Sequence, residues 1–222
     1  MTQKFTLQIT PEIGSVSAIL QKSADATALL VLSHGAGAGM DHPFMQELAD
    51  QLSLLKVATL RFNFPFMENG GAPDRPPKAQ AAIQAAIQTA LLHANGLTLL
   101  TGGKSFGGRM SSQLAATGKL PTQVKGIVYV GFPLHAPNKP SIDRADHLQA
   151  VTLPQLFLQG TRDTLAQFDL IAQVCSKLQL ATLIKLEGAD HSFETLKRSG
   201  ISQEAVRTQL AQEIANFAAK NA

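Results

Sequence analysis

The stretch Leu97–Arg109, LTLLTGGKSFGGR, constrains the fold of this chain more than any other part of its sequence. Its apolar beginning predicts a strand, and the segment Phe106–Thr117 predicts a helix. Residues 103–107 between them read G-K-S-F-G, a G-x-S-x-G pattern. On a strand-to-helix turn this pattern raises the serine hydroxyl above the carboxyl end of a parallel strand. We therefore predict that Ser105 is presented at a sheet edge, between glycines that avoid a clash where strand and helix meet.

Two nucleotide-binding motifs are excluded by single residues. A phosphate-binding loop, G-x-x-x-x-G-K-[ST], ending at Ser105 requires glycine where the chain has Thr98. The loop Ser33–Met40, SHGAGAGM, also contains alternating glycines, but a dinucleotide-binding G-x-G-x-x-G requires glycine at the position of Met40 or of His42. A His-Gly turn after an early apolar strand instead fits a loop whose backbone N–H groups hold an oxyanion.

The glycine loop supplies one of two predicted oxyanion donors. These donors are the N–H of Ala36, in preference to Gly37, and the N–H of Phe106, which follows the serine. His34 either braces the loop by hydrogen bonds or transfers a proton, and its place beside the turn favours bracing. His42 precedes a proline that opens a predicted helix, so we expect it to cap that helix or line the site.

An acid and a base for Ser105 are predicted in the turns after two later strands. Asp163 lies in such a turn, whereas Asp169 falls inside the next predicted helix. His191 follows the last predicted strand, and the order serine, aspartate, histidine is the one used by α/β-hydrolase folds. Two competing histidines precede the acid in the chain, which breaks that order: His135 and His147.

Hydrophobic periodicity predicts alternating strands and helices, which is typical of an α/β fold. Strands are predicted at Phe5–Ile9, Val16–Leu20, Ala28–Leu32, Lys56–Arg61, Leu97–Leu100, Val124–Val130, Leu153–Leu158 and Ala181–Leu186. Helices are predicted at Pro43–Leu54, Ala79–Ala94, Phe106–Thr117, Leu165–Leu178 and Ser202–Ala219. The first two strands alternate in polarity and predict an antiparallel entry, while the later apolar ones suit a mostly parallel sheet covered on both faces.

Composition limits the classes of function. The 222 residues, 45% hydrophobic and 16% charged, predict one globular domain over residues 1–222. A net charge of +3 without a run of Lys or Arg predicts no nucleic-acid partner. Cys175, the only cysteine, falls on an apolar stripe, so no disulfide or Cys-based zinc site is expected. The start MTQKFTLQIT does not resemble a signal peptide, and no apolar run is long enough to span a membrane, so we expect a cytoplasmic protein without membrane contact.

Two irregular segments, Asn63–Pro77 and Gly131–His147, are predicted to be loops beside the site. Several of the residues near the site either line a pocket or brace the loops: His34, Gly35, Phe64, Phe66, Met67 and Arg109. Four arginines near the carboxyl ends of strands either bind an acidic substrate or brace loops, with bracing favoured: Arg61, Arg75, Arg109 and Arg162. The sequence has no long insertion between the predicted strands, so we expect no lid domain.

The chain resembles a small α/β-hydrolase over nearly its whole length. It is similar to a dienelactone-hydrolase-like branch that includes bacterial predicted hydrolases and the eukaryotic NSL-complex subunit and testis-expressed families, in the motifs HGAGAGMDHPFM, LRFNFPFM, APDRPPK, GGKSFGGRM, QGTRD and DHSF. The resemblance implies the α/β-hydrolase fold and a triad of Ser105, Asp163 and His191. Dienelactone hydrolases use a cysteine nucleophile where this chain has serine, so their reaction is not carried over.

These features predict a serine hydrolase that cleaves small or accessible esters through an acyl-enzyme. Its partner would be a small-molecule acyl substrate, and no metal or organic cofactor is implied. Two alternatives stay open. The same triad could serve a thioesterase or peptidase, or the fold could be a catalytically weak scaffold that acts as a protein-interaction module. The intact triad argues against the scaffold, and no feature predicts an oligomeric state.

Overall fold

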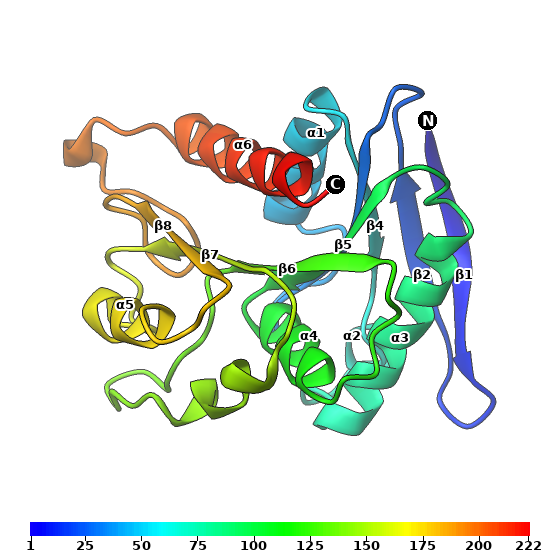
Figure 1. Ribbon diagram of the computed structural model, residues 1–222, viewed down its shortest axis with the longest axis horizontal. Helices are drawn as coiled ribbons and strands as arrows, with labels where there is room; N and C mark the ends of the chain where they lie inside the picture. Colours follow the sequence, from blue (N-terminus) through cyan, green and yellow to red (C-terminus); the bar gives the residue numbers. More distant parts are fainter.

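The computed structural model describes residues 1–222 and is built around an eight-stranded sheet of order β1-β2-β4-β3-β5-β6-β7-β8 (Figure 1). The strands are β1 (Thr2–Thr10), β2 (Gly14–Gln21), β3 (Ala28–Ser33), β4 (Val57–Phe62), β5 (Thr98–Lys104), β6 (Val124–Val130), β7 (Gln155–Gly160) and β8 (Ala181–Leu186). The β1–β2 and β2–β4 pairs are antiparallel, and every pair from β4 across to β8 is parallel. The predicted mostly parallel sheet with an antiparallel entry is confirmed.

Helices cover both faces of this sheet (Figure 1). One face carries α1 (Pro43–Leu54) and α6 (Gln203–Lys220), which contact each other. The other face carries α3 (Pro76–Leu91), α4 (Phe106–Ala116) and α5 (Phe168–Cys175). Three short elements complete the chain: α2 (Pro65–Asn69), η1 (Asp143–Ala150) and η2 (Lys197–Ser199). No lid domain is inserted between the strands, and no helix is long and apolar enough to cross a membrane.

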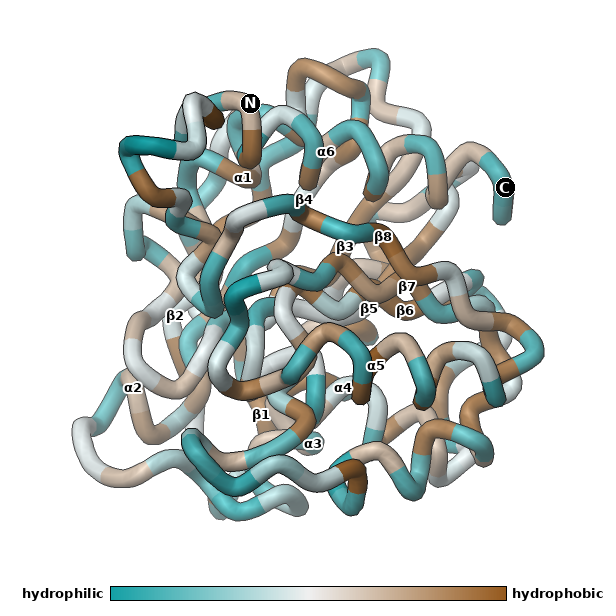
Figure 2. The backbone as a smooth tube through the Cα atoms, turned by 90° about the vertical axis from the view of Figure 1, so that its left-hand side faces the viewer, coloured by the Kyte–Doolittle hydropathy of each residue, from teal (hydrophilic) through white to brown (hydrophobic).

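The central strands are buried on both faces because their residues alternate between two helical layers. In β3, Leu30 and Leu32 pack toward α1 and α6, whereas Leu29 and Val31 pack toward α3, and all four are 0% exposed. Hydrophobic residues are concentrated along these strands in the middle of the molecule (Figure 2). Cys175, the last residue of α5, is buried in the core as predicted, and burial raises the pKa of its thiol to about 12.

The prediction that segments 63–77 and 131–147 contain no helix is wrong. The first contains α2 and the beginning of α3, each with proline at its first helical position, where proline presets the helical φ. The second contains the beginning of η1. Helix α5 is shorter than predicted and begins at Phe168, because the side chain of Asp163 accepts the N–H of Leu165 and holds that residue in a turn.

Candidate active site

Ser105 occupies a strained turn between β5 and α4. Its φ of 47° and ψ of −112° are rarely adopted by a residue with a Cβ. A Cβ on Gly103 would lie 2.1 Å from the carbonyl oxygen of Ser33, and one on Gly107 would lie 2.6 Å from that of His34. Both positions therefore require glycine. The atoms that a Cβ would meet belong to the end of the neighbouring strand β3 and the residue after it. The predicted clash between the strand and helix α4 is therefore not the reason for these glycines.

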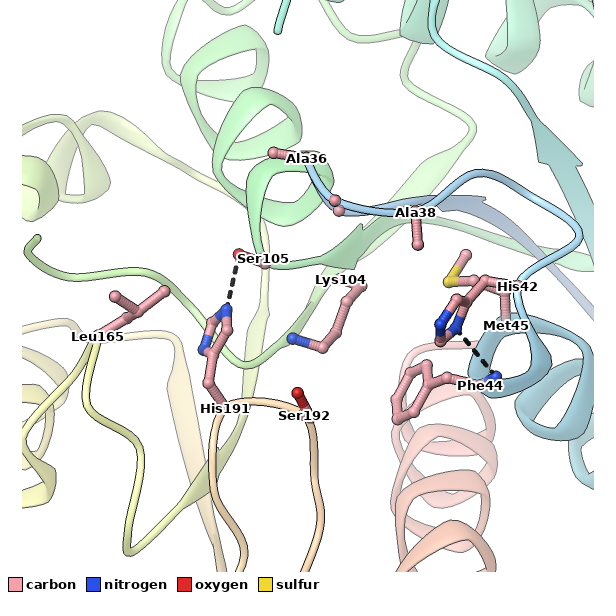
Figure 3. Close-up of a pocket in the computed structure, with 12 residues that line it drawn as sticks. Ala36, Ala38, His42, Phe44, Met45, Lys104, Ser105, Leu165, His191 and Ser192 are labelled. Carbon is pink, nitrogen blue, oxygen red and sulfur yellow. Dashed lines mark hydrogen bonds between the residues drawn. The ribbon is translucent and has the colours of Figure 1, made fainter. Parts of the chain in front are cut away.

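The side chains of Ser105, His191 and Asp163 come together above the carboxyl edge of the sheet, from the turns after β5, β8 and β7. Nε2 of His191 lies 2.9 Å from Ser105 Oγ (Figure 3), and its Nδ1 lies 2.7 Å from Asp163 Oδ2. Because an ionised carboxylate can only accept a hydrogen bond, Nδ1 of the neutral ring carries the proton, and Nε2 accepts a hydrogen bond from the serine hydroxyl.

The Asp163 carboxylate is buried and held by two further donors. Its Oδ2 also accepts a hydrogen bond from Gln159 Nε2 at 2.6 Å, and its Oδ1 accepts the N–H of Leu165 at 2.7 Å. The Gln159 amide oxygen in turn accepts the N–H of Phe132 at 3.0 Å. Gln159 is 0% exposed, so this network fixes the carboxylate that orients His191. Gln159 was not among the predicted site residues, and its place at the start of the QGTRD motif is its only signal in the sequence.

The loop that carries His191 is fixed by its neighbours in the chain. Asp190 Oδ1 accepts two backbone N–H groups, including that of Ser192 at 2.8 Å. Phe193 has a φ of 62°, which is unusual for a bulky residue. Its ring is fully buried and stacks on Phe44 with ring centroids 5.7 Å apart. The strained backbone is therefore held by packing, and the imidazole is positioned by a rigid loop.

The glycine loop after β3 lies directly over this turn. A Cβ on Gly35 would lie 3.7 Å from the Cβ of Ser105. Phe106 is the first residue of α4, so its N–H has no intrahelical acceptor. The two candidates for the second oxyanion donor, Ala36 and Gly37, are exposed and line the same pocket as Ser105. The predicted donors thus lie beside the serine.

His34 makes the bracing contacts that were favoured for it. Its Nε2 accepts the N–H of Phe64 at 2.9 Å, and its Nδ1 donates to the Gly35 carbonyl oxygen at 2.6 Å. The ring is 0% exposed, and burial lowers its pKa, which favours the neutral form that this pair of bonds requires. His34 thereby ties the glycine loop to the chain after β4.

A pocket of about 430 Å³ opens beside Ser105 (Figure 3). Residues from the glycine loop, the start of α1, the serine turn and two later loops line it. The apolar side chains that line it are Ala36, Ala38, Phe44, Met45 and Leu165. The polar side chains that line it are His42, Lys104, Ser105, His191 and Ser192. His42 both lines the pocket and caps α1, because its Nδ1 accepts the N–H of Phe44 at 3.3 Å.

Three residues that were predicted either to line a pocket or to brace loops lie outside the pocket beside Ser105: Phe64, Phe66 and Met67. Phe64 and Phe66 are 0% and 5% exposed, and their ring centroids lie 5.2 and 5.7 Å from that of Phe106. Met67 packs against the same hydrophobic cluster. Of the two alternatives for these residues, packing of the loop onto the body is the one that the structure shows. The pocket-lining alternative does not hold for these three residues, because α2 folds the segment back against Phe106.

None of the four arginines lines the pocket. Arg61 is buried and donates to the Met40 carbonyl oxygen at 3.0 Å. Arg162 donates to the Gly188 carbonyl oxygen, also at 3.0 Å. These two arginines therefore brace loops. The other two also lie outside the pocket: Arg75 at the start of α3 and Arg109 within α4.

Lys104 is the cation that does line the pocket. In the sequence it is the variable residue before the serine of the G-x-S-x-G pattern and the lysine of the excluded phosphate-binding motif. Its side chain leaves the end of β5 beside Ser105, and its Nζ points into the cavity (Figure 3). Nζ makes no hydrogen bond or ion pair with the protein and lies 5.4 Å from the ring centroid of Phe193. Burial lowers the pKa of Lys104 to about 8, although attraction to Asp163 and Asp190 raises it.

The same fold is found in known hydrolases. Dienelactone hydrolase from Anabaena variabilis matches with a TM-score of 0.77 and 18% identity, over 99% of this chain and 98% of that one. A serine hydrolase without lid from Xanthomonas campestris matches with a TM-score of 0.72 and 19% identity, over 98% and 95%. The esterase domain of a Rhodothermus marinus protein matches with a TM-score of 0.74 and 15% identity, over 99% and 98%.

A sequence match extends this likeness from the fold to the family. The profile of the alpha/beta hydrolase domain matches residues 26–219, a range that begins before β3 and ends within α6. It therefore includes the serine turn and the loops that carry Asp163 and His191. The chain belongs to the α/β hydrolase domain family.

Proposed function

We propose that this protein is a serine hydrolase that cleaves small or accessible esters through an acyl-enzyme on Ser105. The observation that carries the proposal is the hydrogen-bonded chain from Ser105 Oγ through His191 to Asp163, with distances of 2.9 and 2.7 Å, at the wall of a pocket. A hydroxyl next to a base that is itself oriented by a carboxylate is the arrangement that nucleophilic catalysis requires.

Acylation begins when Ser105 Oγ attacks the carbonyl carbon of the ester. His191 Nε2 takes the hydroxyl proton, while Asp163 keeps Nδ1 protonated and stabilises the imidazolium. The N–H groups of Phe106 and Ala36 hold the oxyanion. When the tetrahedral intermediate collapses, its bond to the leaving oxygen breaks, and His191 gives its proton to that oxygen, which departs as an alcohol.

Deacylation repeats these steps with water as the nucleophile. A water molecule that enters the open pocket loses a proton to His191 as it attacks the acyl carbon. The carboxylic acid then leaves, and the proton returns to Ser105. The amino end of α4 lies behind the serine, and its partial positive charge supports the oxyanion in both halves of the reaction.

The shape of the site supports a small or accessible substrate. The pocket volume of about 430 Å³ lies in the range of small-molecule sites. No lid domain covers it, and the similar proteins include a serine hydrolase described as having no lid and an esterase domain. Thioesters and amides would follow the same chemical steps, and they differ from esters in the leaving atom that His191 protonates.

The proposal is tested by labelling the purified protein with a fluorophosphonate and measuring its intact mass, beside the Ser105→Ala variant. One adduct on the wild type and none on the variant is the expected result. A panel of 4-nitrophenyl esters of increasing acyl length, with matched thioesters and anilides, then defines the preferred bond. No adduct and no turnover on folded wild-type protein would overturn the proposal and favour the scaffold alternative.

A further inference from the structure

One charge in the pocket has no role in the chemistry proposed for Ser105. The pocket contains no acidic side chain, and Lys104 is its only lysine or arginine. Asp163 lies behind His191 and does not line the cavity. A substrate that enters the pocket therefore meets the nucleophile, its base and one uncompensated ammonium group.

The protein does not use this ammonium as a structural link. Arg207, the nearby cation on α6, donates to Glu47 and to the Phe193 carbonyl oxygen, both at 3.3 Å. Lys104 Nζ has no such partner, and the ring of Phe193 is the aromatic group beneath it. Such a ring offers a desolvated cation only part of the stabilisation that a carboxylate provides.

The two carboxylates that attract Lys104, those of Asp163 and Asp190, already accept hydrogen bonds from other donors. Asp163 accepts hydrogen bonds from His191, Gln159 and the N–H of Leu165. Asp190 Oδ1 accepts two backbone N–H groups of its own loop. Lys104 is half-buried and its ammonium has no hydrogen-bonded partner in the protein, so an anionic group delivered by a ligand would form a charge-assisted hydrogen bond at this place.

We propose that Lys104 selects substrates that carry a carboxylate, so that the preferred substrates are short esters with one free acid group, such as half-esters of dicarboxylic acids. The inference rests on the proposed function of Ser105. Lys104 and Ser105 are adjacent at the end of β5 and face one cavity (Figure 3), so a single small molecule reaches both groups. Apolar side chains on both sides of the cavity, Leu165 on one and Phe44 and Met45 on the other, suit the short hydrocarbon part of such a molecule (Figure 3).

Two matched substrate pairs test the proposal. The first pair, 4-nitrophenyl hydrogen glutarate and 4-nitrophenyl pentanoate, differs in charge on the acyl side. The second pair, 3-acetoxybenzoate and 3-methylphenyl acetate, differs on the alcohol side. We expect the wild type to prefer the charged member of at least one pair, in kcat/KM corrected for the rate without enzyme. Lys104→Met should lower kcat/KM for that member about 10- to 100-fold, as expected for a lost hydrogen bond to a charged group, and change the neutral member less than about 3-fold.

Two further variants make the result specific. Lys104→Arg keeps the charge and should retain most of the preference. Lys119→Met removes an exposed cation outside the pocket and should leave both pairs unchanged, which controls for net charge. Equal losses on the charged and neutral esters of both pairs in Lys104→Met would show that Lys104 acts on the triad or the fold, and would overturn the inference.

The pH profile gives a readout that a structural role would not produce. Because the pKa of Lys104 is about 8, the preference for the charged ester should decline above pH 8 in the wild type and be absent at all pH values in Lys104→Met. The charged and titratable groups that face Lys104 are Asp163, Asp190, His191 and Arg207. These groups are present in both the wild type and Lys104→Met, so a pH-dependent preference that disappears in the variant is due to Lys104.

A measurement on the unmodified protein keeps the inference falsifiable if Lys104→Met does not fold. Glutarate should slow fluorophosphonate labelling of Ser105, whereas its neutral analogue glutaramide should not. Labelling that is slowed equally by both compounds, or by neither, would overturn the inference while leaving the proposed function intact. Loss of labelling in the untreated wild type would overturn the proposed function instead.

Discussion

Two serines at helix α4 each contact a histidine from another segment, and only one of these serine–histidine pairs belongs to the candidate active site. Ser105 precedes the first residue of the helix, and Ser112 lies two turns further on. Ser112 Oγ is 2.7 Å from Nε2 of His147, which is shorter than the 2.9 Å between Ser105 and His191. By distance alone the second pair would be the better nucleophile and base.

The direction of the protons separates the two pairs. The Ser112 hydroxyl donates to the Arg109 carbonyl oxygen at 2.8 Å, so His147 Nε2 must donate to Ser112 and cannot take its proton. No carboxylate is hydrogen-bonded to His147, and Ser112 is 0% exposed. A nucleophile therefore needs a base held in the accepting tautomer and access to a substrate, and a short contact does not supply either.

The largest expected effect comes from removing each hydroxyl in turn. Ser105→Ala should lower kcat for activated esters by about 10⁴-fold or more, because the acyl-enzyme cannot form. Ser112→Ala should change kcat less than about 2-fold and reduce the free energy of unfolding by about 1 kcal/mol, for the lost hydrogen bonds. Ester turnover and urea denaturation measure both effects. Comparable losses of activity in the two variants would contradict the distinction between the pairs.

The next effect tests the carboxylate that orients only one of the histidines. Asp163→Asn should lower kcat about 10⁴-fold, because an amide favours the wrong tautomer of His191. Asp146 lies near His147 but is exposed and makes no hydrogen bond to it, so Asp146→Asn serves as the matched control with activity expected within about 2-fold. A loss below tenfold in Asp163→Asn would mean that another group orients the base.

A smaller effect is expected from the glutamine behind the acid. Gln159→Leu removes the 2.6 Å hydrogen bond to Asp163 and should lower kcat about 10-fold, within the range for a lost bond to a charged group. Gln155, at the other end of β7, bonds the Tyr129 hydroxyl and the Leu148 carbonyl oxygen. Gln155→Leu should therefore lower the melting temperature without changing kcat. If both variants lose only stability, Gln159 does not position the acid.

The smallest effect concerns the histidine that has no catalytic role. Burial, together with the charge of Arg109, lowers the pKa of His147 below its ordinary value of 6.5. The folded protein then binds fewer protons than the unfolded chain as the pH falls below 6.5, so acidification costs stability, by less than about 1.4 kcal/mol per pH unit. His147→Gln should flatten the dependence of the unfolding free energy on pH between 6.5 and 5. An unchanged slope in urea denaturation would contradict this assignment.

The pattern of apolar runs and glycines is enough to predict the sheet and the approach of three distant residues at its edge. Apolar runs such as Ala28–Leu32 can be buried only between two layers of helices, and the glycines around Ser105 permit only one kind of turn. Parallel strands then bring the residues after their carboxyl ends together, so Asp163 and His191 follow from the order of elements. Each of these patterns lies within a short stretch of sequence, so it can be recognised without knowledge of the tertiary contacts.

The side chains that form the pocket, and the contacts that hold them, follow from the packing of distant segments and could not be predicted. Phe64 and Phe66 are residue types that could line a pocket, but the turn into α2 directs their rings into the core next to Phe106. Lys104 occupies a position that its motif leaves free. Its ammonium is left without a partner because residues far along the chain, such as Gln159, satisfy the nearby carboxylates. A pocket wall depends on contacts between segments that are distant in sequence, and no local pattern specifies them.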